Sequence, residues 1–225
     1  MRITVLGTGV VGRTLAANLA GLGHDVVVGT RDPDRTLARS EPDQRGNPPY
    51  SAWAAEHPGV GLAAYAASVA EADVVLNATS GGATEEVLAA IGAELLAGRV
   101  LLDLSNPLDL SAGWPPTLFV KDDDSLGERL QRAYPATRVV KSLNTLNVEL
   151  MVQPDLLGEP STVFVSGDDA EAKATVTQLL TDLGHRDILD LGGIETSRGV
   201  EMYFTLWRQT GAALGTARFN LRVVR

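Results

Sequence analysis

Three glycines near the start of the chain constrain its fold more than any other feature. Gly7, Gly9 and Gly12 form the pattern Gly-x-Gly-x-x-Gly, which follows the apolar run Ile3–Leu6 and precedes a helical stretch starting at Val10. In this order of strand, turn and helix, the N–H groups at the helix start can bind the pyrophosphate of a dinucleotide. The turn therefore predicts an anion site that needs no basic side chain. Its predicted contacts are Gly7, Thr8, Gly9, Val10, Val11 and Gly12.

Short β-branched runs alternate with alanine- and leucine-rich stretches along the chain, which indicates a parallel sheet with helices on both faces. Strands are predicted near residues 3–6, 25–29, 60–63, 74–78, 100–104, 139–143, 162–165 and 188–191, and helices at 10–22, 84–96, 126–134, 170–183 and 197–214. With the glycine turn, this pattern predicts a doubly wound, mostly parallel α/β sheet of the Rossmann type with a C-terminal helical segment. We expect a Rossmann domain that binds the dinucleotide at residues 1–150 and an α/β extension with a long helix at 151–225, packed as one unit with the first.

Composition excludes several function classes. The 225 residues carry a net charge of -9, which repels nucleic acid and anionic membranes. The chain has no cysteine and only three scattered histidines, so neither a disulfide nor a metal site is expected. The first residues lack a secretory pattern, so we expect a cytoplasmic protein. Two segments that interrupt the alternation, residues 40–50 and 106–124, are expected to be surface loops.

The end of the second predicted strand indicates which dinucleotide binds. In NAD-binding chains, an acidic side chain about 20 residues after the glycines bonds the ribose. Here the strand ends in Val28-Gly29-Thr30-Arg31. Thr30 and Arg31 suit a 2'-phosphate, which a carboxylate would repel, so the sequence predicts NADP. Arg35 could flank the same phosphate if a helix begins before it, or could lie on a solvated helix face. Asp32 is expected to cap that helix.

Polar residues also follow the fourth, fifth and sixth predicted strands. In open α/β sheets, ligands bind beyond the carboxyl ends of the strands, so these residues are candidates for binding the nicotinamide half. Ordinary capping of strand ends by Asn, Ser and Thr is the alternative. The candidates are Ala78, Thr79, Ser80, Asn106, Pro107, Asn144 and Thr145.

Several segments together resemble the NADP oxidoreductases that depend on the deazaflavin coenzyme F420, and their bacterial relatives. The matching segments are Gly7–Gly12, Gly23–Arg31, Asn77–Thr79, Asn106–Pro107, Val139–Thr145, Val165–Asp169 and Thr196–Arg198. The resemblance implies direct hydride transfer between the nicotinamide of NADP(H) and the deazaflavin. We expect coenzyme F420 or a flavin as the second substrate. It also implies NADP contacts at residues 8–11, Thr30, Arg31, Arg35, Ala78 and Asn106. The chain departs from the archaeal members at residues 144–147 and in its last helix, so the acceptor stays open.

Hydride transfer between two planar cofactors needs no side-chain acid or base, and we predict no catalytic residue. Lys141 and Asn144 have the Lys-x-x-Asn spacing of hydroxyacid dehydrogenases, but there the pair lies on a helix, whereas Lys141 is predicted in a strand. A reductase of a small carbonyl or imine, with Lys141 as proton donor, is one alternative function. A non-catalytic NADP-sensing protein is another. The aspartates at 122–124 are expected to be an exposed lead into a helix, and no metal site is predicted.

Basic charge and aromatic side chains gather at the end of the chain. Residues 198–225 contain five arginines and a single acidic residue, and Tyr203, Phe204 and Trp207 cluster there at helical spacing. The last helix is predicted to line the pocket of the acceptor or to be buried in a homodimer, and the two are compatible.

Overall fold

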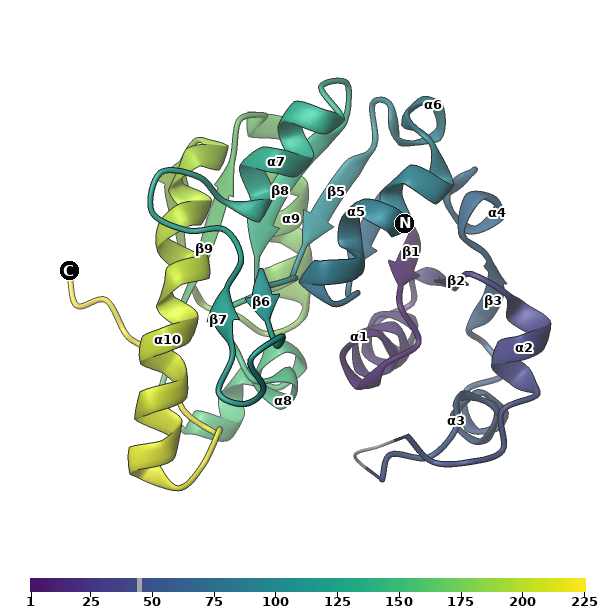
Figure 1. The fold of residues 1–225 in the computed structure, drawn as a ribbon, viewed down its shortest axis with the longest axis horizontal. Helices are drawn as coiled ribbons and strands as arrows, with labels where there is room; N and C mark the ends of the chain where they lie inside the picture. Colours follow the sequence, from purple (N-terminus) through teal and green to yellow (C-terminus); the bar gives the residue numbers. More distant parts are fainter. Residues whose placement is uncertain (44–45) are drawn as a thin grey trace.

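A computed structural model describes residues 1–43 and 46–225, and one eight-stranded sheet forms its centre (Figure 1). The strand order is β10-β9-β8-β5-β4-β1-β2-β3. All eight predicted strands are present, with ends that differ by at most two residues from the prediction. They are β1 (Arg2–Leu6), β2 (Asp25–Thr30), β3 (Gly61–Ala64), β4 (Val74–Asn77), β5 (Val100–Asp103), β8 (Arg138–Ser142), β9 (Thr162–Gly167) and β10 (Asp187–Gly192).

The sheet is mostly parallel, as predicted, but its last two strands run the other way. β8 pairs with β9 in antiparallel register, and β10 pairs with β9 in parallel register. A parallel neighbour requires a crossover helix that returns the chain to the other end of the sheet. The only α-helix between β8 and β9 is α8 (Val148–Val152), which has five residues. The chain therefore turns back alongside β8, and strands from both sides of residue 150 belong to one sheet.

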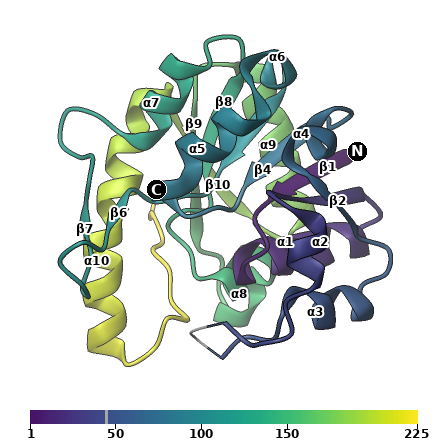
Figure 2. The same cartoon turned by 45° about the vertical axis from the view of Figure 1, so that its right-hand side comes forward.

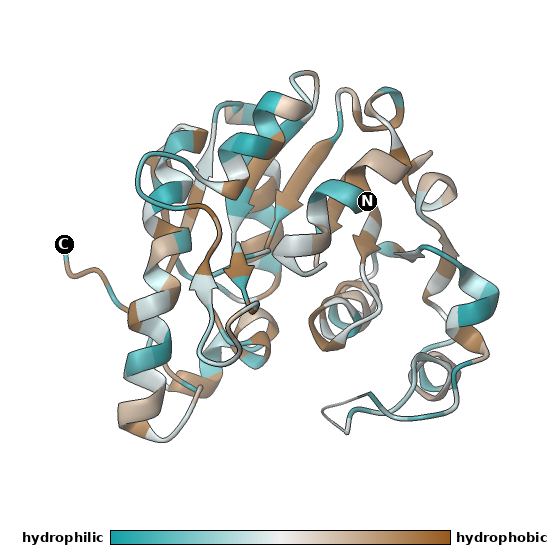
Figure 3. Ribbon diagram, in the orientation of Figure 1, coloured by the Kyte–Doolittle hydropathy of each residue, from teal (hydrophilic) through white to brown (hydrophobic). Residues whose placement is uncertain are grey.

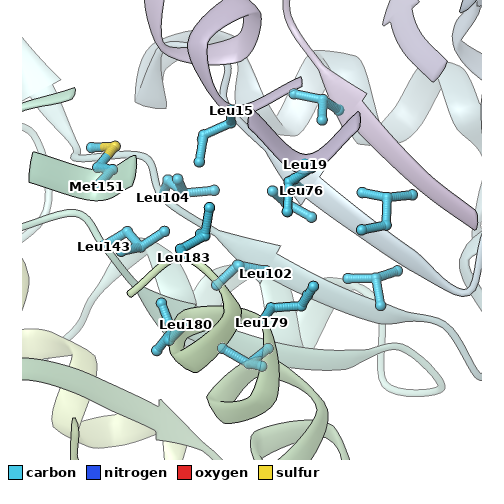
Figure 4. Close-up of a cluster of buried hydrophobic side chains, with 14 of the residues drawn as sticks. Leu15, Leu19, Leu76, Leu102, Leu104, Leu143, Met151, Leu179, Leu180 and Leu183 are labelled. Atoms are coloured by element: carbon cyan, nitrogen blue, oxygen red, sulfur yellow. The ribbon is translucent and has the colours of Figure 1, made fainter. Parts of the chain in front are cut away.

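Helices cover both faces of the sheet (Figures 1 and 2). One face carries α1 (Val10–Gly21), α3 (Tyr50–Glu56), α8 and α9 (Ala170–Asp182), and the other carries α4 (Tyr65–Val69), α5 (Gly81–Ile91), α6 (Ala93–Leu96) and α7 (Leu126–Ala133). The central strands are among the most apolar parts of the ribbon, because both of their faces are buried (Figure 3). Leucines from α1 and α9 pack against strand residues Leu76 and Leu102 in the core between these helices and the sheet (Figure 4). Each such buried side chain stabilises the fold by about 1.5–3 kcal/mol.

The prediction of one helix over residues 84–96 is wrong. The structure has α5 and α6, which are separated at Gly92, where φ is 92°. This left-handed backbone ends a helix. α5 also begins three residues earlier than predicted, at Gly81, where a Cβ would lie 2.0 Å from the Asn106 oxygen. The helices α3, α4 and α8 were not predicted, because five to seven residues are too few to show a helical period.

The two predicted loops carry some regular structure. Within residues 106–124, β6 (Leu108–Asp109) pairs with β7 (Thr117–Leu118), and this hairpin lies beside the long helix α10 (Ser197–Leu214) in Figures 1 and 2. Trp114, at its tip, is 71% exposed. In the loop predicted at 40–50, Tyr50 already belongs to α3, and Gln44 and Arg45 lie outside the described residues.

His185 is a buried histidine that the fold keeps neutral. It is 3% exposed, and its Nε2 donates to the Met151 oxygen at 3.0 Å. Its Nδ1 has no hydrogen-bond partner among the described residues. Burial lowers the pKa of His185 below its usual 6.5, against the smaller effect of the Met151 hydrogen bond. Protonation would create a buried N–H donor with no acceptor.

We expect His185 to make folding sensitive to pH. The unfolded chain takes up a proton at this histidine before the folded chain does, so the free energy of unfolding falls as pH drops below 6.5. The slope should reach at most about 1.4 kcal/mol per pH unit. Urea unfolding between pH 7.5 and 5.5 would show a weaker fall for His185→Gln, whereas His24→Gln, at a partly exposed position, should behave like the parent. An equal fall in parent and His185→Gln would contradict this expectation.

Candidate functional site

The glycine turn joins β1 to α1 and lies against the end of β4. Gly7 has a φ of 115°, which side chains other than glycine rarely tolerate. A Cβ on Gly7 would lie 2.9 Å from the Ala78 oxygen, and a Cβ on Gly12 would lie 2.1 Å from the Gly7 oxygen. A Cβ on Gly9, by contrast, would meet nothing within 4 Å. Packing therefore requires Gly7 and Gly12, while Gly9 keeps the start of α1 open.

The first turn of α1 can bind an anion. Gly9 is the N-cap of this helix, and the N–H groups that follow it, at Val10 and Val11, belong to the turn whose donors have no partner within a helix. The helix dipole adds partial positive charge at the same place. Thr8 and Gly9 border a hollow beside the turn. The open front at Gly9 and these donors fit a pyrophosphate, which is the group that the sequence predicts there.

The end of β2 lies next to the glycine turn and carries the predicted 2'-phosphate residues. Thr30 is mostly buried, and its hydroxyl is 2.9 Å from that of Thr36. Asp32 caps α2 (Pro33–Leu37) by accepting from the Arg35 N–H at 2.9 Å, as predicted. Arg35 is exposed on this short helix. The structure thus brings Thr30, Arg31 and Arg35 to one corner beside the start of α1.

Arg31 has a carboxylate partner that the sequence did not indicate. Its Nη2 lies 2.7 Å from Glu86 Oε1 on α5, and both side chains are 70% exposed. An ion pair this exposed contributes little to stability. The pair holds the guanidinium across the opening between β2 and α5, and a phosphate dianion at Arg31 would compete with Glu86 for it.

The residues predicted to bind the nicotinamide half lie together beyond β4, β5 and β8. Asn106 Nδ2 donates to the Asn144 oxygen at 2.8 Å, and Asn144 Nδ2 donates to Asn106 Oδ1 at 3.0 Å. Asn144 Nδ2 also donates to the Val200 oxygen in α10 at 2.9 Å, so both of its amide protons are used within the protein. Asn106 keeps one amide proton for a ligand. Pro107 and Thr145 are buried, whereas Ser80 is exposed.

A buried ion cluster lies directly beneath these asparagines. Lys141 in β8 is completely buried, and its Nζ is 2.7 Å from Asp103 Oδ2 in β5 and 2.8 Å from Glu201 Oε1 in α10. It also donates to the Ser105 oxygen at 2.5 Å. Burial alone would lower the pKa of Lys141, but the two carboxylates outweigh it and raise that pKa. Lys141 is therefore charged, paired and out of reach of a substrate.

Both carboxylates of the cluster also accept hydrogen bonds from other elements of the fold. Glu201 accepts the N–H groups of Leu126 and Gly127 at 2.8 and 3.0 Å, so it caps the start of α7 from another helix. Asp103 Oδ1 accepts from Asn77 Nδ2 at 2.7 Å, and Asn77 Oδ1 accepts from the Thr79 hydroxyl at 2.6 Å. The carboxylates of Asp103 and Glu201 thus join β4, β5, β8, α7 and α10 into one network.

The C-terminal helix is partly covered by the chain's own tail. Phe204, Trp207 and Phe219 stack in series, with ring centroids 6.0 and 5.7 Å apart. Most of the arginines of residues 198–225 have partners within the protein. Four of the five pair with acidic side chains. These pairs are Arg198–Glu128, Arg218–Glu149, Arg222–Glu159 and Arg225–Asp187.

Within residues 1–43 and 46–225, no group of three or more histidine or acidic side chains is placed to hold a metal ion. Asp124 instead pairs with Arg129 and Arg132. Among the helices of the described residues, none has the length and apolar character needed to cross a membrane.

Three residues of this region were not selected from the sequence. Glu86, Asp103 and Glu201 are acidic residues in or beside apolar segments, and only Asp103 left a signal, because it follows the apolar strand residues Val100–Leu102. An acidic residue that ends a buried strand needs a buried partner. Lys141 was the matching cation, but the sequence does not show that β5 and β8 are neighbours.

Lys141→Met should be strongly destabilising, because it leaves Asp103 and Glu201 buried without a counter-charge. We expect a loss of about 3–5 kcal/mol in the free energy of unfolding, measured by urea titration. Arg186→Met is the control, because Arg186 pairs with Asp155 at 3.0 Å on the surface and should matter little. A loss no larger than that of the control would show that the cluster does not hold the fold together.

The chain is similar to several known oxidoreductases. Residues 2–107 match the family model described as "NADP oxidoreductase coenzyme F420-dependent". A crystal structure from Arthrobacter sp. FB24, described as a proposed F420-dependent NADP reductase, is 54% identical, covers 100% of both chains and superimposes with a TM-score of 0.95. The F420-dependent NADP reductase of Methanothermobacter marburgensis is 27% identical over 89% of this chain and 88% of its own length.

The metalloreductase STEAP3 of Rattus norvegicus is 28% identical over 89% of this chain, and this chain spans 36% of the length of that relative. The shared region is thus only part of the larger protein. The resemblance inferred from the sequence is confirmed across the full length by the Arthrobacter structure. This chain belongs to the coenzyme F420-dependent family of NADP oxidoreductases.

Proposed function

We propose that this protein transfers hydride between NADP(H) and a planar second redox partner, a deazaflavin such as coenzyme F420 or a flavin. The observation that carries the proposal is the glycine turn, which is open at Gly9 and lies beside Thr30 and Arg31 at the carboxyl edge of the sheet. Bound NADP would supply the hydride at its nicotinamide ring. The family supports NADP as the cofactor, and the second substrate is our proposal.

The residues of the chain would bind, orient and shield the reactants. The first turn of α1 would bind the pyrophosphate, and Arg31 the 2'-phosphate after leaving Glu86. The remaining amide proton of Asn106 is placed to orient the nicotinamide end. Buried Pro107 and Thr145 would keep water from that end. Such positioning and exclusion of water are what hydride transfer requires of a protein.

The burial of Lys141 argues against the reduction of a small carbonyl or imine. That reaction needs a proton donor at the nicotinamide, and Lys141 was the candidate from the sequence. Its Nζ is instead enclosed by Asp103, Glu201 and the Ser105 oxygen. Transfer between NADP(H) and a deazaflavin or flavin has no such requirement.

The homodimer predicted from the sequence stays a prediction. Leu206 and Leu214 of α10 are 53% and 58% exposed, and they would lie in such an interface. A dimer through this face would leave the end of β2 accessible, because α10 and α2 lie at opposite ends of the molecule, with α1 between them (Figure 1).

Arg31→Ala should remove most of the preference for NADPH over NADH. A charge-assisted bond to phosphate contributes about 1.5–3 kcal/mol, so the dissociation constant of NADPH should rise roughly 10- to 100-fold while that of NADH changes little. Titration calorimetry measures both constants. Arg2→Ala is the matched control, because Arg2 also forms an exposed pair, with Glu71 at 2.8 Å, but lies at the amino end of β1. Equal affinities for the two cofactors in the parent would refute the proposed NADP site.

The acceptor is tested by anaerobic oxidation of NADPH with coenzyme F420, FMN and FAD in parallel, followed by absorbance. We expect turnover with coenzyme F420 or with a flavin, and none with Gly9→Ala. A Cβ at Gly9 meets no protein atom within 4 Å, so this variant should fold normally while its methyl group occupies the approach of the pyrophosphate. An intact parent that binds NADPH and reduces none of the three acceptors would instead be the NADP-sensing protein of the alternative interpretation.

A further inference from the structure

A hollow of about 540 Å³ lies beside the glycine turn, toward α2 and the start of α3. Thr8 and Gly9 of the turn, Arg13 of α1 and Thr36 of α2 line it, and residues 38–43 and 48–50 form its outer wall. Thr36 contacts Thr30 at the end of β2 through their hydroxyls, 2.9 Å apart. The hollow therefore connects the start of α1 with the strand end at which the adenosine ribose lies in this fold.

Arg13 is the unusual residue in this hollow. It is only 8% exposed, and its Nη1 donates to the Pro48 oxygen at 2.8 Å. Among the described residues it forms no other hydrogen bond and no ion pair, although a guanidinium has five N–H donors. Lys141, the other lysine or arginine of residues 1–43 and 46–225 that is buried to this extent, has two carboxylates as partners. The wall of the hollow also carries Glu41 and Asp43, but among the described residues no carboxylate oxygen lies within 4 Å of the Arg13 guanidinium. A cation that is withdrawn from water without a carboxylate in contact is unfavourable, and an anion that entered the hollow beside it would relieve this.

The direction of the Arg13 side chain also fits an anion near the turn. Side chains of an α-helix slope toward its N-terminus, so Arg13, in the second turn of α1, leans back along the first. Its guanidinium thus shares one hollow with Thr8, Gly9 and Thr36. The pyrophosphate has its own donors in the first turn of α1. The anion that Arg13 could bind is therefore a different phosphate, on the ribose side of the pyrophosphate.

We propose that Arg13 binds the ribose 2'-phosphate of NADP from inside the hollow, opposite Arg31. The inference deepens the proposed function and rests on it. Arg31 and Arg35 approach the phosphate from solvent, where water and Glu86 compete for them, whereas Arg13 is shielded from water. Arg13 is then a determinant of the preference for NADPH over NADH, in addition to the residues that the end of β2 supplies.

The test compares ligands that differ only in the phosphate, by titration calorimetry on the intact protein. Arg13→Met removes the charge and keeps most of the apolar stem. We expect the dissociation constants of NADPH and 2',5'-ADP to rise roughly 10- to 100-fold, and those of NADH and 5'-AMP to change less than about twofold. Arg13→Lys restores the charge without the planar fork and should recover part of the loss.

Arg99→Met is the matched control for folding. Arg99 also bonds only main-chain carbonyls among the described residues, those of Leu95, Ala70 and Ala72, and it lies far from the carboxyl edge of the sheet. It should leave all four constants unchanged. Equal weakening of NADPH and NADH in Arg13→Met would overturn the proposal, because Arg13 would then act on the pyrophosphate or on folding.

Unchanged NADPH binding in Arg13→Met would also overturn the proposed role of Arg13. If Arg31→Ala nevertheless loses the preference for NADPH, the proposed NADP site stands and only the role of Arg13 is wrong. If the parent has no preference for NADPH, both proposals fall together. Because the readout is binding of 2',5'-ADP against 5'-AMP, it does not depend on which acceptor the protein reduces.

Discussion

The buried ammonium of Lys141 fixes the edge of the sheet on which the site depends. One charge contacts Asp103 from β5 and Glu201 from α10, both within 2.8 Å, and all three side chains are almost fully enclosed. Such a cluster is not more stable than well-packed apolar residues would be. It does specify the position of α10 more strictly, because any shift of α10 along the sheet would separate buried charges. The cluster therefore sets where α10 begins relative to β5 and β8.

The backbone that follows β8, next to this cluster, has an unusual conformation. Leu143 follows β8 with a φ of 61°, a conformation that is strained for a side chain of this kind. This turn directs Asn144 so that its amide bonds both Asn106 and the Val200 oxygen of α10. The strain persists because Leu143 is buried and its neighbours are bonded on both sides. The end of β8, the end of β5 and the first turn of α10 thus form one rigid corner. In the proposed function this corner would position the nicotinamide, and a misplacement of about 1 Å can cost 100-fold in rate.

Local patterns in the sequence predict the strands, the glycine turn and the cap at Asp32, because each depends on residues next to one another in the chain. They do not predict that β9 runs antiparallel to β8, which follows from the short helix α8. Nor do they predict Glu86, Asp103 or Glu201 as partners, since these pairs join residues that are 38 to 60 positions apart. The helix break at Gly92 could have been predicted, because a glycine inside a helical stretch signals a break. Arg13 could not be selected from the sequence, because its burial, and the lack of a carboxylate contact among the described residues, arise only on folding.

The distribution of ion pairs explains how so acidic a chain can hold a polyanion. Most of its basic side chains already have a carboxylate within 4 Å, including four of the five arginines in the tail. Among the described residues, six have none. Arg13, Arg35 and Arg39 lie around the start of α1 and the helix that follows β2, whereas Arg99, Lys121 and Arg208 lie elsewhere. The field that a ligand meets within a Debye length of about 8 Å depends on these local cations and on the helix start, and only weakly on the net charge of -9. The buried pairs of Lys141 tie the sheet to α10, and the cations without a carboxylate around the start of α1 remain available to the dinucleotide.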